Sequence, residues 1–153
     1  MRRLDDRAVS TTIGYALTLG VTSLLITGLL IAGGGFLQNQ REVTTETELE
    51  VIGEQVSADI SSADRLSASD ADEVNITRSL PDSVTGSQYT ISVKTPPQTQ
   101  THLELRSADP EVTVRVDVAI HEASLAATDV DGGDIQVSYD ESSDELVLRN
   151  ADA

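Results

Sequence analysis

The side chains that could take part in catalysis are few and form no recognisable constellation. His102 and His121 are the only histidines, and the chain has no cysteine, which excludes a disulfide framework and a thiolate metal site. Both histidines fall in segments that alternate like strands, and neither has a second histidine at a metal-binding spacing. An active site needs a nucleophile with a base, a metal cluster or a tuned carboxylate pair. We therefore predict two ordinary exposed histidines, no cofactor and no enzymatic activity.

The segment Asp129-Val130-Asp131-Gly132-Gly133-Asp134 is a candidate cation loop. Ca²⁺ sites in proteins use clustered carboxylate oxygens around a sharp glycine turn. This segment lacks the bidentate glutamate that ends an EF-hand loop. Because the chain has 26 acidic residues, a solvated turn is the simpler interpretation, and we predict no metal site.

The triplet Asn75-Ile76-Thr77 fits the acceptor pattern for N-linked glycosylation. The pattern has this meaning only for a segment that reaches the outside of the cell. Asn75 is therefore a candidate glycosylation site, and it can be modified only if the part of the chain that contains it is exported.

The charge of the chain restricts both its environment and its partners. It has 26 acidic against 10 basic residues, a formal net charge of -16, and Lys94 is its only lysine. An excess of carboxylates keeps a protein hydrated where salt screens charges within a few ångströms. We interpret this composition as halophilic. It also argues against DNA or RNA as a partner, because phosphates are neutralised by Lys and Arg.

An apolar segment runs from Ala8 to Leu37 without a charged residue. As a helix it would span about 45 Å at ~1.5 Å per residue, more than the ~30 Å hydrocarbon core of a bilayer. Arginines precede the segment and glutamates follow it, so the positive-inside rule predicts a cytoplasmic N-terminus and an extracellular head. The apolar region of a secretory signal is shorter, ~7–15 residues, and cleavage at the small residues Ala32 to Gly35 is the alternative.

The junction before this segment reads Arg7-Ala8-Val9-Ser10, and Ile13-Gly14 follows. It resembles the class III signal peptide of haloarchaeal type IV pilin-like proteins, in which a short charged leader ends in a basic residue plus Gly or Ala. The resemblance covers the chain up to Leu37. It implies that a prepilin peptidase cleaves between Ala8 and Val9 and leaves the helix attached. Thr11 stands where many relatives carry Pro, and Ile13 stands where bacterial pilins carry the Glu used in their assembly.

Within the apolar segment, mostly small residues recur at every fourth position: Ala16, Gly20, Leu24 and Gly28. Such a stripe lets a second helix pack closely in a membrane. It would suit a filament core or an oligomeric anchor. A plain membrane anchor with a positive-inside flank is the alternative.

The sequence after the apolar segment predicts a second helix. Gly33-Gly34-Gly35 predicts a hinge, because each glycine weakens a helix by ~1 kcal/mol relative to Ala. From Val43 to Leu66 apolar residues recur at three- and four-residue spacing, which indicates an amphipathic helix. We expect its apolar face to pack beneath its own head rather than on neighbouring helices of a polymer. The small polar stretch from Ser67 to Asp72 predicts a linker.

The remaining sequence changes to a period of two, which predicts strands at 74–77, 89–94, 102–105, 112–118, 135–139 and 146–148. The last pair should form a hairpin closed by Tyr139 and Leu146. We predict an α+β fold in which a long N-terminal transmembrane helix continues into an amphipathic helix and then into a small antiparallel sheet or sandwich. The expected parts are a charged leader (1–8), the pilin-like hydrophobic helix (9–37), the amphipathic helix (38–66) and an acidic β-rich extracellular head (67–153).

The function that this organisation favours is a non-enzymatic archaeal cell-surface protein. We expect a pilin-like subunit that assembles with itself or with other pilin-like subunits through its hydrophobic helix. Its other partners would be the lipid bilayer and the prepilin peptidase. The alternative is a single-pass membrane protein with an extracellular binding or accessory domain that does not polymerise. An anchored hydrolase is the third and least favoured hypothesis.

Overall fold

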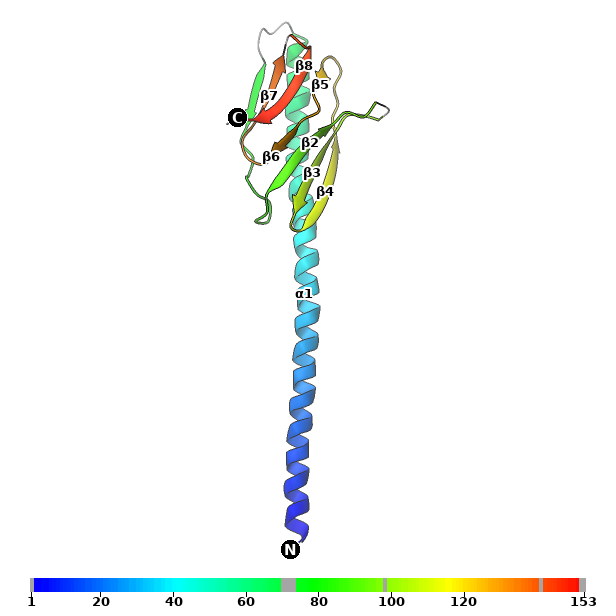
Figure 1. The fold of residues 1–153 in the computed structure, drawn as a ribbon, viewed down its shortest axis with the longest axis vertical. Helices are drawn as coiled ribbons and strands as arrows, with labels where there is room; N and C mark the ends of the chain where they lie inside the picture. The colour runs from blue at the N-terminus through cyan, green and yellow to red at the C-terminus, as the bar shows by residue number, and fades with distance from the viewer. Residues whose placement is uncertain (1, 70–73, 98, 141, 152–153) are drawn as a thin grey trace. The chain divides into compact units, whose positions relative to one another are not determined.

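The computed structural model describes residues 2–69, 74–97, 99–140 and 142–151, and side chains from residue 12 onward (Figure 1). One helix, α1 (Arg2–Ser67), precedes eight strands: β1 (Asn75–Arg78), β2 (Tyr89–Lys94), β3 (His102–Ala108), β4 (Glu111–Asp117), β5 (Ser124–Leu125), β6 (Asp129–Asp131), β7 (Ile135–Asp140) and β8 (Glu145–Asn150). The chain divides into two units, Met1–Gln40 and Arg41–Ala153, which are described separately below. The α+β fold class predicted from the sequence is confirmed.

Helix α1 continues without interruption through Gly33, Gly34 and Gly35. The sequence predicted a hinge at these glycines and a second helix after it, whereas the structure has a single helix, α1, on both sides of them. Each glycine costs only ~1 kcal/mol relative to Ala, and helix propagation is cooperative once the flanking turns have formed. Apolar helix formers on the N-terminal side and Phe36 to Gln40 on the other side supply those turns.

The strands of the second unit form two four-stranded sheets. In the first, with the order β1-β7-β8-β5, β1 and β8 flank β7 in antiparallel pairs and β5 runs parallel to β8. In the second, with the order β4-β3-β2-β6, all pairs are antiparallel. Tyr139 pairs with Leu146 in the β7–β8 hairpin, as predicted.

Residues 41–67 of α1 pass behind the sheets in the view of Figure 1 and supply one side of the core. The helix buries Leu49, Ile52, Val56, Ile60 and Ala63. The strands contribute their alternate residues, so the facing set is Ile91, Val93, Leu103, Leu105, Ile135, Val137, Leu146 and Leu148. The expectation that the amphipathic helix packs beneath its own head is confirmed. Removal of these apolar side chains from water supplies most of the free energy that stabilises the packing of the helix on the sheets.

Gly53 marks the closest approach of α1 to the second sheet. A Cβ added there would lie 2.7 Å from Val116 Cγ2 and 2.8 Å from Leu105 Cδ1. The helix therefore lies so close to β3 and β4 that any larger residue at position 53 would displace Val116 or Leu105.

Polar contacts hold the helix to the strands at three further points. Arg78 of β1 donates from Nε to Asp59 Oδ2 and from Nη2 to Asp59 Oδ1, the latter at 2.6 Å. The Ser57 and Ser61 hydroxyls donate to the carbonyls of Asp117 and Ala119, each at 3.0 Å. These bonds satisfy carbonyls next to the outer end of β4, which is an edge strand.

The third point is Asp64, whose side chain is almost completely buried. Its carboxylate accepts the backbone N–H groups of His121, Glu122 and Ala123 at 2.9, 3.1 and 2.9 Å. Burial acts to raise the pKa of Asp64, but these three donors outweigh it, with help from His121, and the pKa lies below its usual value. The last helical turn thus holds the loop before β5 through one ionised side chain.

Candidate functional site

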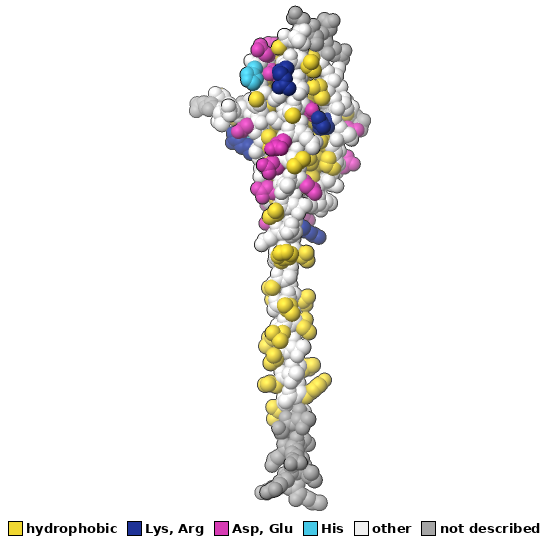
Figure 2. All heavy atoms as spheres, turned by 180° about the vertical axis from the view of Figure 1, so that it is seen from behind, with side chains coloured by type: hydrophobic (Ala, Val, Ile, Leu, Met, Phe, Trp, Pro, Cys, Tyr) yellow, Lys and Arg dark blue, Asp and Glu magenta, His cyan; other side chains and the backbone are white. Residues whose placement is uncertain are grey.

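The apolar part of α1 presents large side chains on all sides. Within the described residues of the first unit, the large hydrophobic side chains from Ile13 to Leu37 are exposed, with Val21 at 50% and Leu24 at 75% of their surface. Figure 2 shows hydrophobic side chains along this stretch and no coloured charge between them. By length and composition, this helix could cross a membrane. A helix that is apolar on every side is suited to lipid or to other apolar helices.

Three threonine side chains of this segment form hydrogen bonds within the helix. The hydroxyls of Thr18, Thr22 and Thr27 donate to the carbonyls four residues earlier, at 2.9, 2.8 and 2.9 Å. In hydrocarbon an unpaired hydroxyl would be costly. Back-bonding of this kind is how Ser and Thr are accommodated in membrane helices.

The residues predicted to mediate helix packing, Ala16, Gly20, Leu24 and Gly28, are all exposed. A Cβ added at Gly20 or Gly28 would meet nothing within 4 Å. These positions leave room for a second helix, and their role in packing stays a prediction. Ala8 and Val9, the predicted cleavage positions, lie within α1, but their side chains are outside the described part of the chain.

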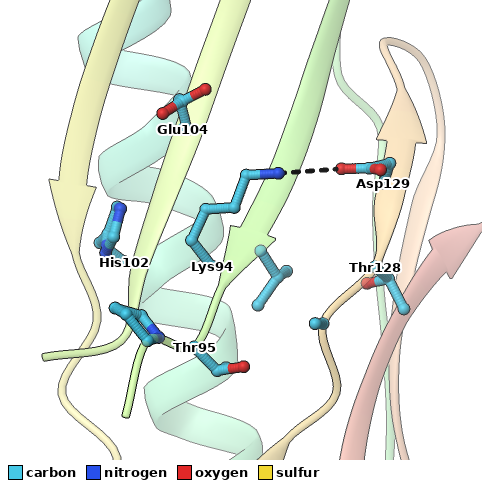
Figure 3. A pocket seen from close by; sticks show the side chains of 9 residues that line it. Lys94, Thr95, His102, Glu104, Thr128 and Asp129 are labelled. Atoms are coloured by element: carbon cyan, nitrogen blue, oxygen red, sulfur yellow. Dashed lines mark ion pairs between the residues drawn. The ribbon is translucent and has the colours of Figure 1, made fainter. Parts of the chain in front are cut away.

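The second unit has an open cleft of about 490 Å³ at one end of the second sheet (Figure 3). Its polar side chains include Lys94, His102, Glu104 and Asp129. Lys94 Nζ lies 3.7 Å from Asp129 Oδ1, across the β2–β6 pairing. The Ser92 hydroxyl and then the Lys94 ammonium lower the pKa of Asp129. This pair could not be predicted from the sequence, because the register that brings β6 beside β2 depends on contacts between distant segments.

The histidines are in different environments. His102 is buried in β3, which corrects the expectation of an exposed side chain, and its Nδ1 lies 3.1 Å from the carbonyl of Gln100. His121 is exposed, as predicted, and its Nδ1 lies 3.9 Å from Asp64 Oδ2. It lies in a loop rather than in a strand. Among the described residues, no group of three or more His, Asp or Glu side chains could hold a metal ion.

The acidic segment from Asp129 to Asp134 has a structural explanation. Its first three residues form β6. Gly132 accommodates Tyr89, because a Cβ there would lie 2.6 Å from Tyr89 Cε1, whereas Gly133 has a φ of +113° and a Cβ there would lie 2.8 Å from Asp82 Oδ1. Burial raises the pKa of Tyr89 to about 12, and its hydroxyl donates to the Pro81 carbonyl at 2.8 Å.

The carboxylates of this segment have separate partners. Besides the contact of Asp129 with Lys94, Asp131 accepts from the Thr90 hydroxyl at 3.4 Å, and Asp134 accepts from the Ser79 hydroxyl at 2.6 Å. The glycines that suggested a cation turn are thus explained by packing, and the carboxylates do not converge.

Asn75, the candidate glycosylation site, is the first residue of β1 and is exposed. Thr77 lies on the same face of the strand and is also exposed. The Asn75 Oδ1 accepts a hydrogen bond from Gln136 Nε2 at 3.3 Å. Both side chains of the acceptor pattern are therefore accessible.

Comparison with known proteins gives one family. The searches of curated proteins and of solved structures returned no match. A family model described as a family of unknown function (DUF7266) matches residues 4–150, which includes the apolar segment and both sheets. Because this match covers nearly the whole chain, the protein belongs to the DUF7266 family.

Proposed function

We propose that the protein is a pilin-like subunit of the archaeal cell surface, processed by a prepilin peptidase and assembled through the apolar part of α1. The observation that carries the proposal is that one unbroken helix combines two roles. Its residues 41–67 form part of the core of the head, whereas the described apolar residues from Ile13 to Leu37 are exposed along their whole length. A helix of this kind needs an apolar environment, and a bilayer and a bundle of identical helices both supply one.

The leader supports the same proposal from the sequence. Arg7-Ala8-Val9-Ser10 stands directly before the uncharged segment, where the class III signal places its cleavage site. Cleavage between Ala8 and Val9 would remove Arg2, Arg3 and Arg7 together. The helix could then leave the bilayer for a filament without carrying cytoplasmic arginines through the membrane, a step that costs several kcal/mol per charge at the bilayer centre.

The first test is the intact mass of the protein recovered from membranes and from sheared surface fractions, in cells with and without the prepilin peptidase. We expect a peptidase-dependent N-terminus at Val9 and the processed chain in the sheared fraction. The Ala8→Trp variant should accumulate unprocessed, because the cleavage site requires a small residue, and Arg3→Lys is the matched leader control.

Two results would count against the proposal. A full-length chain confined to membranes in peptidase-positive cells would favour the alternative, a single-pass membrane protein with an accessory head that does not polymerise. A processed chain that never enters the sheared fraction would show that the protein is a substrate of the peptidase but not a subunit of a filament. The head and its open cleft would then be the part of the molecule that meets a partner.

A further inference from the structure

The outer face of the first sheet carries few charges in the part that lies away from the β7–β8 hairpin. Strand pairing places Asn75 opposite Ser138 and Thr77 opposite Gln136, and β8 continues these rows with Val147 and Arg149. These side chains lie on the side of the sheet opposite the buried Val137 and Leu148, and Ser138 on this side is only 5% exposed. We call this set the β1–β7–β8 outer face: Asn75, Thr77, Gln136, Ser138, Val147 and Arg149.

Arg149 is the only charged member of this set, although the whole chain carries a net charge of -16. Its Nη2 donates to the Ser138 hydroxyl, and no salt bridge to Arg149 occurs within the described residues. Asp140 and Glu145 lie on the same side of these strands, one pair further toward the hairpin, so the carboxylates of this side of the sheet gather at its hairpin end. The corresponding outer face of the second sheet is densely charged: Lys94, Glu104, Arg106, Arg115, Asp117, Asp129 and Asp131.

A surface of amides and hydroxyls with one guanidinium suits a neutral, hydroxyl-rich ligand. Such a ligand can exchange its hydrogen bonds to water for bonds to Thr77, Gln136 and Arg149 without burying a carboxylate, which would carry a large desolvation cost. A second copy of this acidic chain is a poorer occupant, because its carboxylates would outnumber the single arginine.

The glycosylation acceptor lies within the same face. Asn75 and Thr77 are both exposed there, and β1 is an edge strand of the sheet, so the acceptor amide and the hydroxyl that the pattern requires can be approached from solvent. An oligosaccharide attached to Asn75 would begin one strand away from Ser138 and two strands away from Val147.

We propose that Asn75 carries an N-linked oligosaccharide whose first sugars lie on the β1–β7–β8 outer face. The donor would be an oligosaccharide joined through phosphate to a membrane lipid. The side-chain nitrogen of Asn75 forms a bond to C1 of the first sugar and gives up one proton. The C1–O bond to phosphate breaks, and the lipid phosphate leaves with the bonding electron pair. This modification requires an exported head, as in the proposed function, but neither leader cleavage nor filament assembly.

The modification is tested by mass spectrometry of the full-length protein purified from the cells that produce it, in the Asn75→Gln, Thr77→Val and Thr77→Ser variants. We expect a glycan mass on the peptide that contains Asn75, its loss in the first two variants and its retention with Thr77→Ser. Asn150→Gln is the matched control, because Asn150-Ala151-Asp152 lacks the acceptor pattern. An unmodified Asn75 in a head that external protease can digest would overturn the inference and leave the proposed topology intact.

The docking of the sugars is tested by a double-mutant cycle between the glycan and Arg149. The glycosylated protein should unfold a few degrees higher than Asn75→Gln, and this difference should disappear in the Arg149→Ala background. Arg106→Ala, on the outer face of the second sheet, should leave the difference unchanged. A glycan effect of equal size in the wild-type and Arg149→Ala backgrounds would show that the sugars do not rest on this face.

Discussion

Asp64 shows how one buried charge can fix a loop. Three backbone N–H groups of residues 121–123 converge on its carboxylate, and its side chain is almost completely enclosed. Hydrogen bonds to a charged group contribute more than neutral ones, and a buried donor left without an acceptor is costly. The carboxylate therefore contributes to stability through bonds that an uncharged side chain of the same shape reproduces only in part.

We predict that Asp64→Asn lowers the free energy of unfolding of the full-length protein by about 1.5–3 kcal/mol. The amide presents N–H groups toward donors that need an acceptor, so at least one bond is lost. Glu54→Gln is the control, because Glu54 is exposed on the same helix, and its effect should stay within about 0.5 kcal/mol. Denaturant titration of detergent-solubilised protein measures both variants. Equal stabilities of the two variants would contradict this view of Asp64.

The same residue predicts a pH dependence. The pKa of Asp64 in the folded protein lies below its usual value of 3.8, because the backbone donors and His121 outweigh the effect of burial. The folded state thus binds fewer protons than the unfolded state, and stability falls as the pH falls. The contribution of Asp64 is fully present above pH 3.8 and is lost as the pH falls through its lowered folded value. Unfolding should be measured at constant salt from pH 6 downward. The free energy of unfolding should fall less with pH in Asp64→Asn than in the wild type.

At the scale of elements, the contact between α1 and the second sheet depends on Gly53. Gly53→Ala gains ~1 kcal/mol of helix propensity but places a methyl group 2.7 Å from Val116 Cγ2. Overpacking of this kind costs about 1–3 kcal/mol, so we expect a net loss of stability in thermal unfolding. Gly28→Ala is the control, because its Cβ would meet nothing within 4 Å, and the head should unfold at an unchanged temperature. A stabilised Gly53→Ala variant would show that the helix can move away from the sheet at little cost.

Elements with strong local patterns could be predicted from the sequence, whereas those that depend on distant partners could not. Strand β2 was predicted with its observed bounds, because Tyr89, Ile91 and Val93 alternate with polar residues and all three are buried. The hairpin pairing of Tyr139 with Leu146 followed from the same pattern. The two missed strands, β5 and β6, are very short. They exist because β8 and β2 offer them a hydrogen-bonding edge, and no local signal indicates this.

The candidate sites divide in the same way. The apolar helix and the acceptor pattern at Asn75 could be found by composition and motif alone. The cleft beside Lys94 and the charge-poor face around Arg149 depend on the strand register, which places residues far apart in sequence in one row. The glycines at 132 and 133 are the clearest misleading signal. Their spacing suggested a cation turn, but Gly132 is explained by its contact with Tyr89 and Gly133 by its positive φ.

The charge of the whole molecule predicts a requirement for salt. At a net charge of -16 the carboxylates repel one another, and the screening length grows from ~3 Å at 1 M to ~30 Å at 0.01 M ionic strength. We expect far-UV circular dichroism to show loss of structure in the head as salt is lowered from molar to millimolar concentration. The triple variant Glu46→Gln, Glu50→Gln and Glu54→Gln removes exposed charges from α1. It should lower the salt concentration that the head needs to keep its structure. A spectrum that does not change with salt would rule out the halophilic interpretation.

The unbroken passage of α1 through Gly33, Gly34 and Gly35 also has a mechanical meaning. With the apolar segment held in a membrane or a filament, as proposed, tension on the head would travel along the backbone of this helix. The glycines form its weakest turn, so this turn should open first under load. Each residue that leaves the helix lengthens from ~1.5 Å to about 3.3–3.6 Å along the chain. The triglycine would then act as an extensible tether, which absorbs a sudden pull before the strands of the head begin to separate.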